Sequence, residues 1–233
     1  PDLLIPDCNA SIDDGYGSYH KTCTIVPQNQ CHTFWMGNLE NDYFWYPGET
    51  PRHQVSLSPY ALSRNLVTAS EYRHCVEAGA CPDPVQGDVC YEPLDNISHW
   101  QTTESNVWFT SKDEHPVTCV PRQDMRTYCA WLGGNLPTEA QLEYATVGPM
   151  QTSYDLRHFP WGDDDDECHV NIIGDDPFEK TSPVGFFDGL LKTRAEGGWA
   201  FGPDTYQTCD DMSPFGLHDL TGNLSDMVAD SPS

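Results

Sequence analysis

The ten cysteines are the residues of this 233-residue chain with the widest range of possible chemistry. A cysteine can act as a nucleophilic thiolate, ligate a metal ion or form a disulfide. Redox and metal-binding pairs in reduced compartments commonly occur as Cys-x-x-Cys, and the sequence contains no such pair. We therefore expect most of the cysteines to be paired in disulfides, which indicates an extracytoplasmic protein, whether secreted, periplasmic or at the cell surface.

Other side chains give weaker chemical signals. There are nine histidines, but no two of them lie four residues apart around a glutamate, so the sequence favours structural histidines over catalytic metal ligands. No Gly-x-Ser-x-Gly segment is present to position a serine nucleophile. The acidic run at 163–167 is typical of a solvated face, with cation binding as the alternative.

Three helices that would position such groups have clear sequence signals. Apolar residues recur at three- and four-residue steps after Pro121, and they predict one buried helical face: Met125, Tyr128, Cys129 and Leu132. The Gly133-Gly134 pair should end this helix. Thr138 and Gln141 form a capping box that begins the next helix, and a similar box at Thr68 and Glu71 begins an earlier one.

The remaining chain is predicted to be mostly loop. The alternation at 53–57 predicts a short strand with Val55 and Leu57 facing inward. Residues 1–30 lack periodicity and are interpreted as a loop-rich, cysteine-containing lead-in, and residues 188–211 as a Gly-rich insertion. Cys81 and Cys90 bracket a Pro-rich loop, so we expect them to form a local disulfide.

Seven ordered segments resemble landmarks of the formylglycine-generating enzyme family, also called the sulfatase-modifying factor family. They are FWMG at 34–37, VTASEY at 67–72, HPV at 115–117, LPTEAQLEYA at 136–145, PWGD at 160–163, TSPVG at 181–185 and FGLHDLTGN at 215–223. The resemblance implies an α+β, loop-rich, C-type-lectin-like fold with short helices and small antiparallel sheets. It divides the chain into the lead-in at 1–30 and a family-like domain at 31–233 that lacks the family's C-terminal part.

The activity implied by the resemblance is oxidation of a substrate cysteine to formylglycine in sulfatases, by a copper-dependent oxidoreductase. The family's two reactive cysteines, which bind the copper, lie in a segment that would begin after Ser233. Cys168 and Cys209 are not in the matching position, so no catalytic residue and no copper site is assigned. We expect a formylglycine-generating-enzyme-like domain that is inactive as these residues stand. The alternative is a non-catalytic secreted module that binds peptide or carbohydrate on the same scaffold.

The resemblance also implies two calcium sites in loops. The first would use the side chains of Asn171 and Asp176 and the carbonyls of Ile172 and Phe178. The second would use four groups from one loop: the carboxylates of Asp219 and Asp226 and the carbonyls of Gly222 and Leu224. Calcium accepts such mixed carboxylate and carbonyl oxygens. The alternative is that the acids cap turns or are solvated.

Composition limits the partners. A formal charge of −25 would repel nucleic acid and anionic membrane surfaces, and no apolar run approaches the length of a membrane span. The expected partner is a protein or peptide, as the resemblance implies for a sulfatase. Three N-glycosylation sequons begin at Asn9, Asn96 and Asn223. The family partner of Cys129 lies near the domain's end, which this sequence lacks, so we expect Cys129 to be without it.

Overall fold

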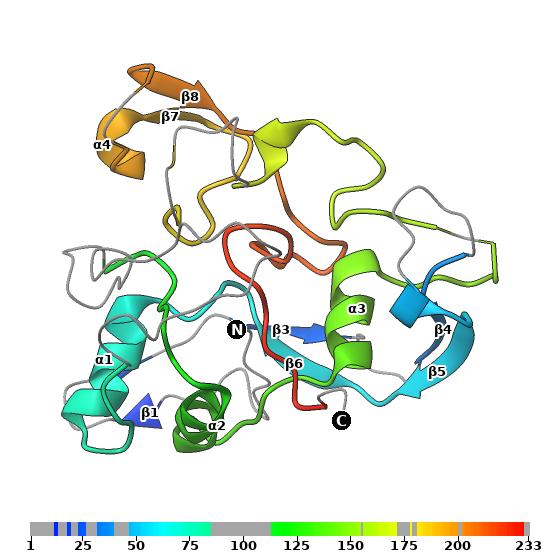
Figure 1. Ribbon diagram of the computed structural model, residues 1–233, viewed down its shortest axis with the longest axis horizontal. Coiled ribbons are helices and arrows are strands. Elements are labelled where there is room, and N and C mark those ends of the chain that lie inside the picture. Colours follow the sequence, from blue (N-terminus) through cyan, green and yellow to red (C-terminus); the bar gives the residue numbers. More distant parts are fainter. Residues whose placement is uncertain are drawn as a thin grey trace.

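The computed structural model describes residues 12–13, 18–19, 23–26, 32–39, 47–84, 113–154, 156–171, 178, 181–199 and 202–230. Its strands pair into two-stranded antiparallel sheets, β1 with β2, β3 with β6, β4 with β5 and β7 with β8. The strands are β1 Ile12–Asp13, β2 Ser18–Tyr19, β3 Cys23–Val26, β4 His32–Met36, β5 His53–Leu57, β6 Tyr60–Ser63, β7 Leu191–Thr193 and β8 Thr205–Gln207. Long loops join these short elements, which confirms the predicted α+β, loop-rich class (Figure 1).

The helices in the described residues are short as well. They are α1 Ala69–Glu77, α2 Arg122–Trp131, α3 Glu139–Val147 and α4 Arg194–Gly197, with single 3-10 turns η1 Pro47–Glu49 and η3 Glu167–His169. In the part of the chain that the structure describes, no helix combines the length and apolar character needed to cross a bilayer. Figure 1 places α1 beside α2 and α3 beside the β4–β5 pair.

The predicted helix boundaries are confirmed. Thr68 and Thr138 each accept a hydrogen bond from the backbone N–H three residues later, and Glu71 and Gln141 complete the two capping boxes. The predicted face of α2 is buried, and Gly133 follows it in the left-handed conformation, with φ of 78°. Local side-chain chemistry therefore fixes where these helices begin and end.

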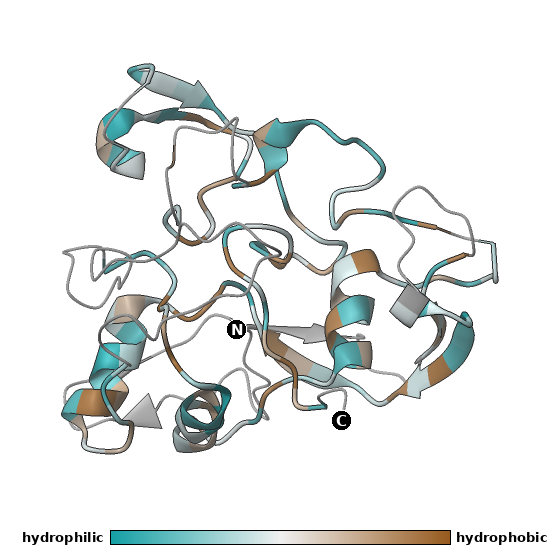
Figure 2. Cartoon of the chain, in the orientation of Figure 1, coloured by the Kyte–Doolittle hydropathy of each residue, from teal (hydrophilic) through white to brown (hydrophobic). Residues whose placement is uncertain are grey.

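The strand pairing extends further toward the N-terminus than the sequence indicated. The prediction for 53–57 is confirmed as β5, with Val55 and Leu57 packed against the core. The arrow of β5 shows bands of both hydrophilic and hydrophobic colour (Figure 2). No strand was expected before Cys31, yet β3 pairs with the fully buried strand β6 from Cys23 opposite Ser63 to Val26 opposite Tyr60. A strand of four residues is too short to give a readable alternation, and its partner supplies the hydrogen bonds that define it.

The expected Cys81–Cys90 disulfide is wrong, because Cys81 is bonded to Cys75. After α1 ends, Gly79 adopts φ of 71° and turns the chain back on the helix. The N–H groups of Ala80 and Cys81 then both donate to the carbonyl of Cys75. This left-handed reversal brings the two sulfurs together across a separation of six residues. The Pro-rich loop between Cys81 and Cys90, on which the expected pairing is based, gives no signal for this bridge. Cys90 lies outside the described residues.

Three buried clusters hold the described elements together. The first joins α1 to α2, with Tyr72 and Tyr128 ring centroids 5.5 Å apart. The second joins α3 to the β4–β5 pair, with an edge-to-face contact of Phe34 and Tyr144. The third consists of aromatic rings beside the β7–β8 hairpin: Phe178, Phe186, Phe187 and Trp199. The predicted insertion at 188–211 therefore contains a hairpin and α4, anchored through aromatic packing.

Candidate functional site

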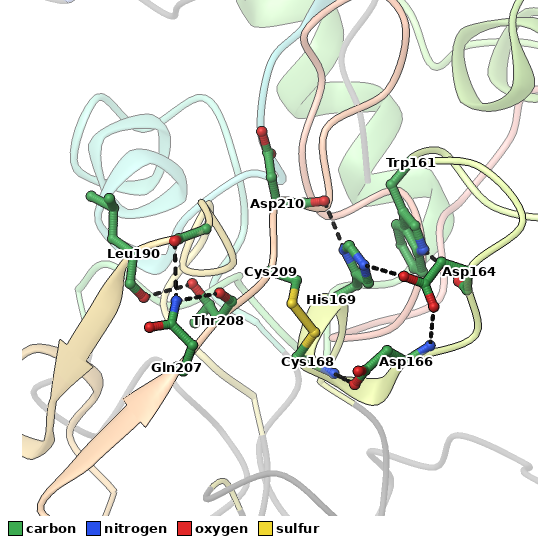
Figure 3. Close-up of a disulfide and its surroundings, with 11 residues drawn as sticks. Trp161, Asp164, Asp166, Cys168, His169, Leu190, Gln207, Thr208, Cys209 and Asp210 are labelled. Carbon is green, nitrogen blue, oxygen red and sulfur yellow. Dashed lines mark hydrogen bonds and ion pairs between the residues drawn. A yellow bond between two sulfur atoms is a disulfide. The ribbon is translucent and has the colours of Figure 1, made fainter.

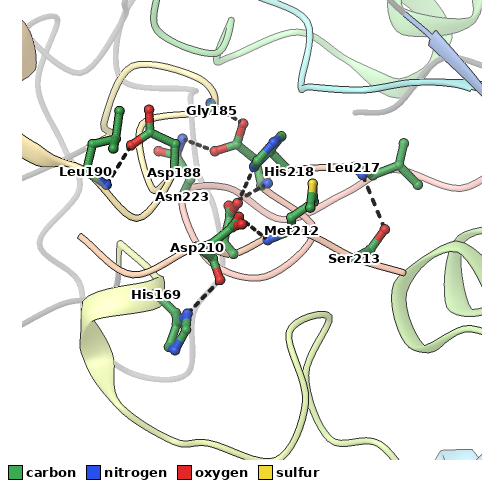
Figure 4. Close-up of polar contacts among 12 residues, drawn as sticks. His169, Gly185, Asp188, Leu190, Asp210, Met212, Ser213, Leu217, His218 and Asn223 are labelled. Carbon is green, nitrogen blue, oxygen red and sulfur yellow. Dashed lines mark hydrogen bonds and ion pairs between the residues drawn. The ribbon is translucent and has the colours of Figure 1, made fainter. Parts of the chain in front are cut away.

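The candidate site is a clamp between two loops, residues 181–185 and residues 215–223. The Asp219 carboxylate accepts a hydrogen bond from the Gly185 N–H at 2.7 Å (Figure 4). The Asn223 amide accepts from the Ser182 N–H at 2.9 Å and donates to the Ser182 carbonyl at 3.2 Å. We call this set of contacts the loop clamp. Because side-chain groups pair with backbone groups of the opposite loop, neither loop needs regular secondary structure to hold its shape.

The backbone of the second loop is unusual at three positions. Asp219, Gly222 and Asn223 have φ of 61°, 76° and 57°. Asp and Asn tolerate this left-handed region better than other residues, whereas Gly222 is required for a further reason. A Cβ atom at Gly222 would lie 2.1 Å from Val170 Cγ2 and 2.7 Å from the Asn171 carbonyl oxygen. The loop therefore passes close to residues 170–171, and the Asn223 N–H donates to that same carbonyl.

Other segments fix the loop clamp in the molecule. The His115 ring lies 3.0 Å from the Thr181 hydroxyl, and both residues are buried. The Val184 N–H donates to the Glu114 carbonyl, and the His218 N–H donates to the Arg64 carbonyl. Three of the seven sequence landmarks, HPV, TSPVG and FGLHDLTGN, thus meet at one place. The structure brings them together although residues 117 and 215 are far apart in the chain.

A chain of ionisable groups continues from the loop clamp. His218 Nδ1 lies 2.5 Å from Asp211 Oδ1, and the Asp219 N–H donates to Asp211 Oδ2 at 2.9 Å. Asp211 and Asp219 are 3% and 2% exposed. Asp210 is exposed and accepts from the Met212 N–H. Two buried carboxylates and one histidine are therefore coupled within eight residues.

Burial determines how these groups ionise. Desolvation, reinforced by the nearby Asp211 charge, raises the pKa of Asp219 to about 7. Burial also raises the pKa of Asp211, although the hydrogen bond from His218 opposes the shift. That bond raises the pKa of His218, so the imidazolium is favoured beside Asp211. A pKa of about 7 leaves Asp219 partly protonated near neutral pH, next to the hydrogen-bonded pair of Asp211 and His218.

The predicted calcium ligands fall into two groups. Asn171 and Phe178 are buried, whereas Ile172 and Asp176 lie outside the described residues. The second set lies on the second loop of the clamp and the residues that directly follow it, and burial raises the pKa of Asp226 there as well. Asp226 Oδ1 is enclosed, although the residue as a whole is half-buried. The Asp219 carboxylate and the Gly222 carbonyl each already accept a backbone hydrogen bond, the latter from Leu224 at 2.6 Å. The oxygen donors are nevertheless of the type that calcium prefers.

None of the cysteines whose side chains the structure describes belongs to a reactive thiol pair. Cys168 is bonded to Cys209, Cys75 to Cys81, and Cys119 is also in a disulfide. Cys129 keeps a thiol in the core between α1 and α2, where it is 2% exposed. The expectation that most cysteines are paired agrees with this arrangement, and such bonds are typical of an oxidising compartment.

Sequence reasoning missed two features of this region. The Asp211–His218 pair spans seven residues with no recognisable motif, and Asp211 fell within a segment interpreted as an insertion. The Cys168–Cys209 bridge spans 41 residues, and neither cysteine had a local signal for its partner. Disulfide connectivity is set by the tertiary fold, so composition could predict pairing but not this pair.

Comparisons with known proteins agree with the sequence landmarks. A family model described as "Sulfatase-modifying factor enzyme 1-like domain" matches residues 29–233. A formylglycine-generating enzyme from Thermomonospora curvata is 27% identical over 234 residues, covering 85% of this chain and 68% of that protein. The inactive C-alpha-formylglycine-generating enzyme 2 from Bos taurus is 25% identical over 207 residues, covering 78% of this chain and 63% of that protein. The chain thus spans about two thirds of the length of these relatives.

A solved structure supports the fold alone. PvdO from Pseudomonas aeruginosa matches with a TM-score of 0.61 and 24% sequence identity, covering 99% of this chain and 75% of that one. The match extends across the chain, so the short helices and paired strands described above are arranged as in that protein.

The close approach at Gly222 predicts a graded loss of stability. Gly133→Ala and Gly222→Ala both place a side chain at a φ near 77°, but only Gly222 has neighbours within 4 Å of the new Cβ. Gly133→Ala should cost about 1 kcal/mol from backbone strain. Gly222→Ala should cost about 1–3 kcal/mol more, because Val170 and the Asn171 backbone must move. Urea unfolding under non-reducing conditions measures both, and equal losses would contradict the close packing.

The raised pKa of Asp219 predicts a dependence of stability on pH. The folded-state pKa of about 7 exceeds the ordinary value of 3.8, so the folded chain binds more protons than the unfolded chain between these limits. This contribution is complete below the unfolded pKa and is lost as pH rises through the folded one. In calcium-free buffer, Asp219→Asn should therefore gain stability relative to the natural chain from about pH 4 to about pH 7, at up to about 1.4 kcal/mol per unit.

Asp165→Asn is the matched control for this measurement, because Asp165 is exposed in the same chain. Its unfolding free energy should follow that of the natural protein at each pH. If Asp219→Asn also ran parallel to the natural protein, the raised pKa of Asp219 would be refuted.

Proposed function

The chain belongs to the sulfatase-modifying factor enzyme 1-like family, and on that premise we propose that it is a formylglycine-generating-enzyme-like domain that engages a protein or peptide substrate without oxidising it. The family activity would be oxidation of a cysteine in a substrate protein such as a sulfatase. We place the domain outside the cytoplasm, because its disulfides suit an oxidising compartment. The match to formylglycine-generating enzymes does not favour the alternative, a non-catalytic secreted module that binds peptide or carbohydrate on the same scaffold.

The state of the described cysteines carries the proposal. Thiolate is both the nucleophile and the ligand that copper requires in this chemistry. Cys168, Cys209, Cys75, Cys81 and Cys119 are in disulfides. Cys129 is enclosed in the core, so a substrate cannot reach it without unpacking α1 from α2. The described residues therefore do not fit a copper site, and no reaction step is assigned through that metal.

A related protein supports the proposal that a member of this family can lack the oxidising activity. The protein from Bos taurus that matches 78% of this chain is named an inactive enzyme, so the family scaffold exists there without the activity. In our proposal the scaffold is kept for recognition of the substrate chain. Its charge of −25 favours peptides that carry basic residues over acidic ones.

We also propose that calcium stabilises the loops of this domain. The proposed first site uses Asn171, Ile172, Asp176 and Phe178, and the second uses Asp219, Gly222, Leu224 and Asp226. Two observations support the second site: both of its carboxyl groups have a pKa raised by burial, and Gly222 holds the loop against residues 170–171. A bound divalent cation would relieve the cost of burying two carboxylates on one loop.

Mass spectrometry of a cysteine-containing sulfatase peptide tests the lack of turnover. The purified chain, supplied with copper, oxygen and a thiol reductant, should leave the peptide cysteine unchanged. The Thermomonospora curvata enzyme, treated in the same way, is the positive control. Retention of the peptide on the immobilised chain, measured separately, tests substrate engagement. Formylglycine in the peptide, at a rate that exceeds a no-protein control, would overturn the proposal of inactivity.

Thermal unfolding with calcium and with a chelator tests the proposed sites. We expect calcium in large excess over its dissociation constant to add on the order of 3 kcal/mol through mass action. Asp176→Ala and Asp226→Ala should each lose part of this gain, whereas Asp165→Ala should keep it. Superimposable melting curves of the natural chain in calcium and in chelator would refute both sites.

A further inference from the structure

A histidine lies directly beside the Cys168–Cys209 disulfide. The Sγ atoms of both cysteines and a ring nitrogen of His169 lie within 4.8 Å of one another. Both cysteines are half-buried, so solvent reaches this part of the molecule. The same region of Figure 3 contains Asp164, whose carboxylate lies 3.8 Å from His169 Nε2. Two sulfurs and one imidazole thus gather at one point, and the Asp164 carboxylate lies beside the same imidazole ring.

The His169 ring is held in one orientation. Its Nδ1 lies 2.8 Å from the Asp210 carbonyl oxygen, and a carbonyl can only accept, so Nδ1 carries the proton. In the neutral ring the lone pair is therefore on Nε2. The ring also stacks on Trp161, with centroids 4.6 Å apart and planes 6° apart, and Trp161 Nε1 donates to the Asp164 carbonyl. Metal-binding histidines commonly have their second nitrogen bonded in this way to a backbone carbonyl.

The two cysteines are held together by more than their sulfur bond. The Cys209 N–H donates to the Cys168 carbonyl at 2.7 Å. The hydrogen bond from His169 Nδ1 to the Asp210 carbonyl joins the next residue of each segment in the same way. The Cys168 N–H in turn donates to Asp166 Oδ1 at 3.0 Å, which caps η3. None of these contacts involves a sulfur atom. Reduction of the disulfide would therefore leave both thiols next to His169.

We propose that Cys168, Cys209, His169 and Asp164 form a zinc site that opens when the Cys168–Cys209 disulfide is reduced. A dithiol reductant supplies the two electrons: its thiolate attacks one sulfur, which forms a mixed disulfide and releases the other protein cysteine as a thiolate. The second thiol of the reductant then displaces the remaining protein thiol as the reductant closes to its own disulfide. Each protein thiol loses its proton on binding Zn²⁺, so two protons are released as two Zn–S bonds form.

The donor set selects zinc. Tetrahedral coordination by two thiolates, one imidazole nitrogen and one carboxylate oxygen suits this borderline cation, whereas a hard carboxylate suits copper(I) poorly. Calcium and magnesium require oxygen ligands and would not bind sulfur. The Cα atoms of Cys168 and Cys209 are 5.1 Å apart, so the sulfurs can separate by side-chain rotation without unfolding the segments.

The Cys75–Cys81 disulfide gives an internal contrast. Cys75 and Cys81 are 0% and 7% exposed, and no histidine, aspartate or glutamate groups with them as possible ligands in the described residues. A reductant should therefore reach Cys168–Cys209 before Cys75–Cys81, because thiol–disulfide exchange needs access to a sulfur atom.

The test uses the full 233-residue chain and Co²⁺ as a spectroscopic substitute for zinc. After mild reduction and anaerobic removal of the reductant, Co²⁺ should give a thiolate charge-transfer band and tetrahedral ligand-field bands, and Zn²⁺ should abolish both. The unreduced chain should give neither. Cys168→Ser with Cys209→Ser should remove the bands. His169→Gln should weaken Co²⁺ affinity about 10–100-fold, the range seen when the surroundings of a metal site are disrupted.

His158→Gln is the matched control, because His158 pairs with Asp163 on the same loop and is not in the group. Its Co²⁺ affinity should equal that of the natural chain, and circular dichroism checks that every variant is folded. Three outcomes would overturn the proposal: no thiolate band in the reduced chain, bands that persist without Cys168 and Cys209, or unchanged affinity in a folded His169→Gln. Asp164→Asn, which should also weaken binding, provides a second variant if His169→Gln does not fold.

Discussion

The structure depends above all on the pairing of side-chain groups with the backbone of distant loops. Asp219 and Asn223 bond to the N–H and carbonyl groups of 182–185, and Glu143 of α3 bonds to the Gly37 N–H in the same manner. A chain with few and short strands cannot satisfy its buried backbone groups by sheet hydrogen bonds alone. Polar side chains at fixed positions take the place of the absent strand partners by hydrogen bonding to backbone groups. The sequence landmarks contain many of the residues that make these bonds.

The use of buried carboxylates as hydrogen-bond acceptors for the backbone has an electrostatic cost. A carboxylate that accepts from a buried N–H must itself be buried, and the pKa of Asp219, Asp211 and Glu143 is raised for that reason. His218 offsets part of the cost at Asp211 by donating to it. The second loop therefore concentrates negative charge where solvent is absent. A cation, a proton or an imidazolium can each neutralise it, and these three compete for the same carboxyl groups.

The sequence predicted the structural features that depend only on residues close together in the chain. Thr68 with Glu71 and Thr138 with Gln141 identified two helices because a capping box acts over three residues. The family landmarks identified the fold class, although they carried no contact information. The partner of Cys81, the strand β3 and the Asp211–His218 pair were not foreseen, because each arises from segments that the fold brings together. Cys75 illustrates this point. It lies on α1, six positions before Cys81, and the two sulfurs meet only because the chain reverses direction at Gly79.

The loop clamp also bears on how the protein can be produced. Asn223 begins a glycosylation sequon, and its Nδ2 atom, the one a glycan would occupy, donates to the Ser182 carbonyl between two packed loops. A sugar chain added at this nitrogen before folding would replace one of the two hydrogens that donate to Ser182 and Asp219, so the loop clamp would be weakened. In a eukaryotic secretory pathway, folding and sugar transfer would therefore compete for one side chain. A host without N-glycosylation avoids that competition.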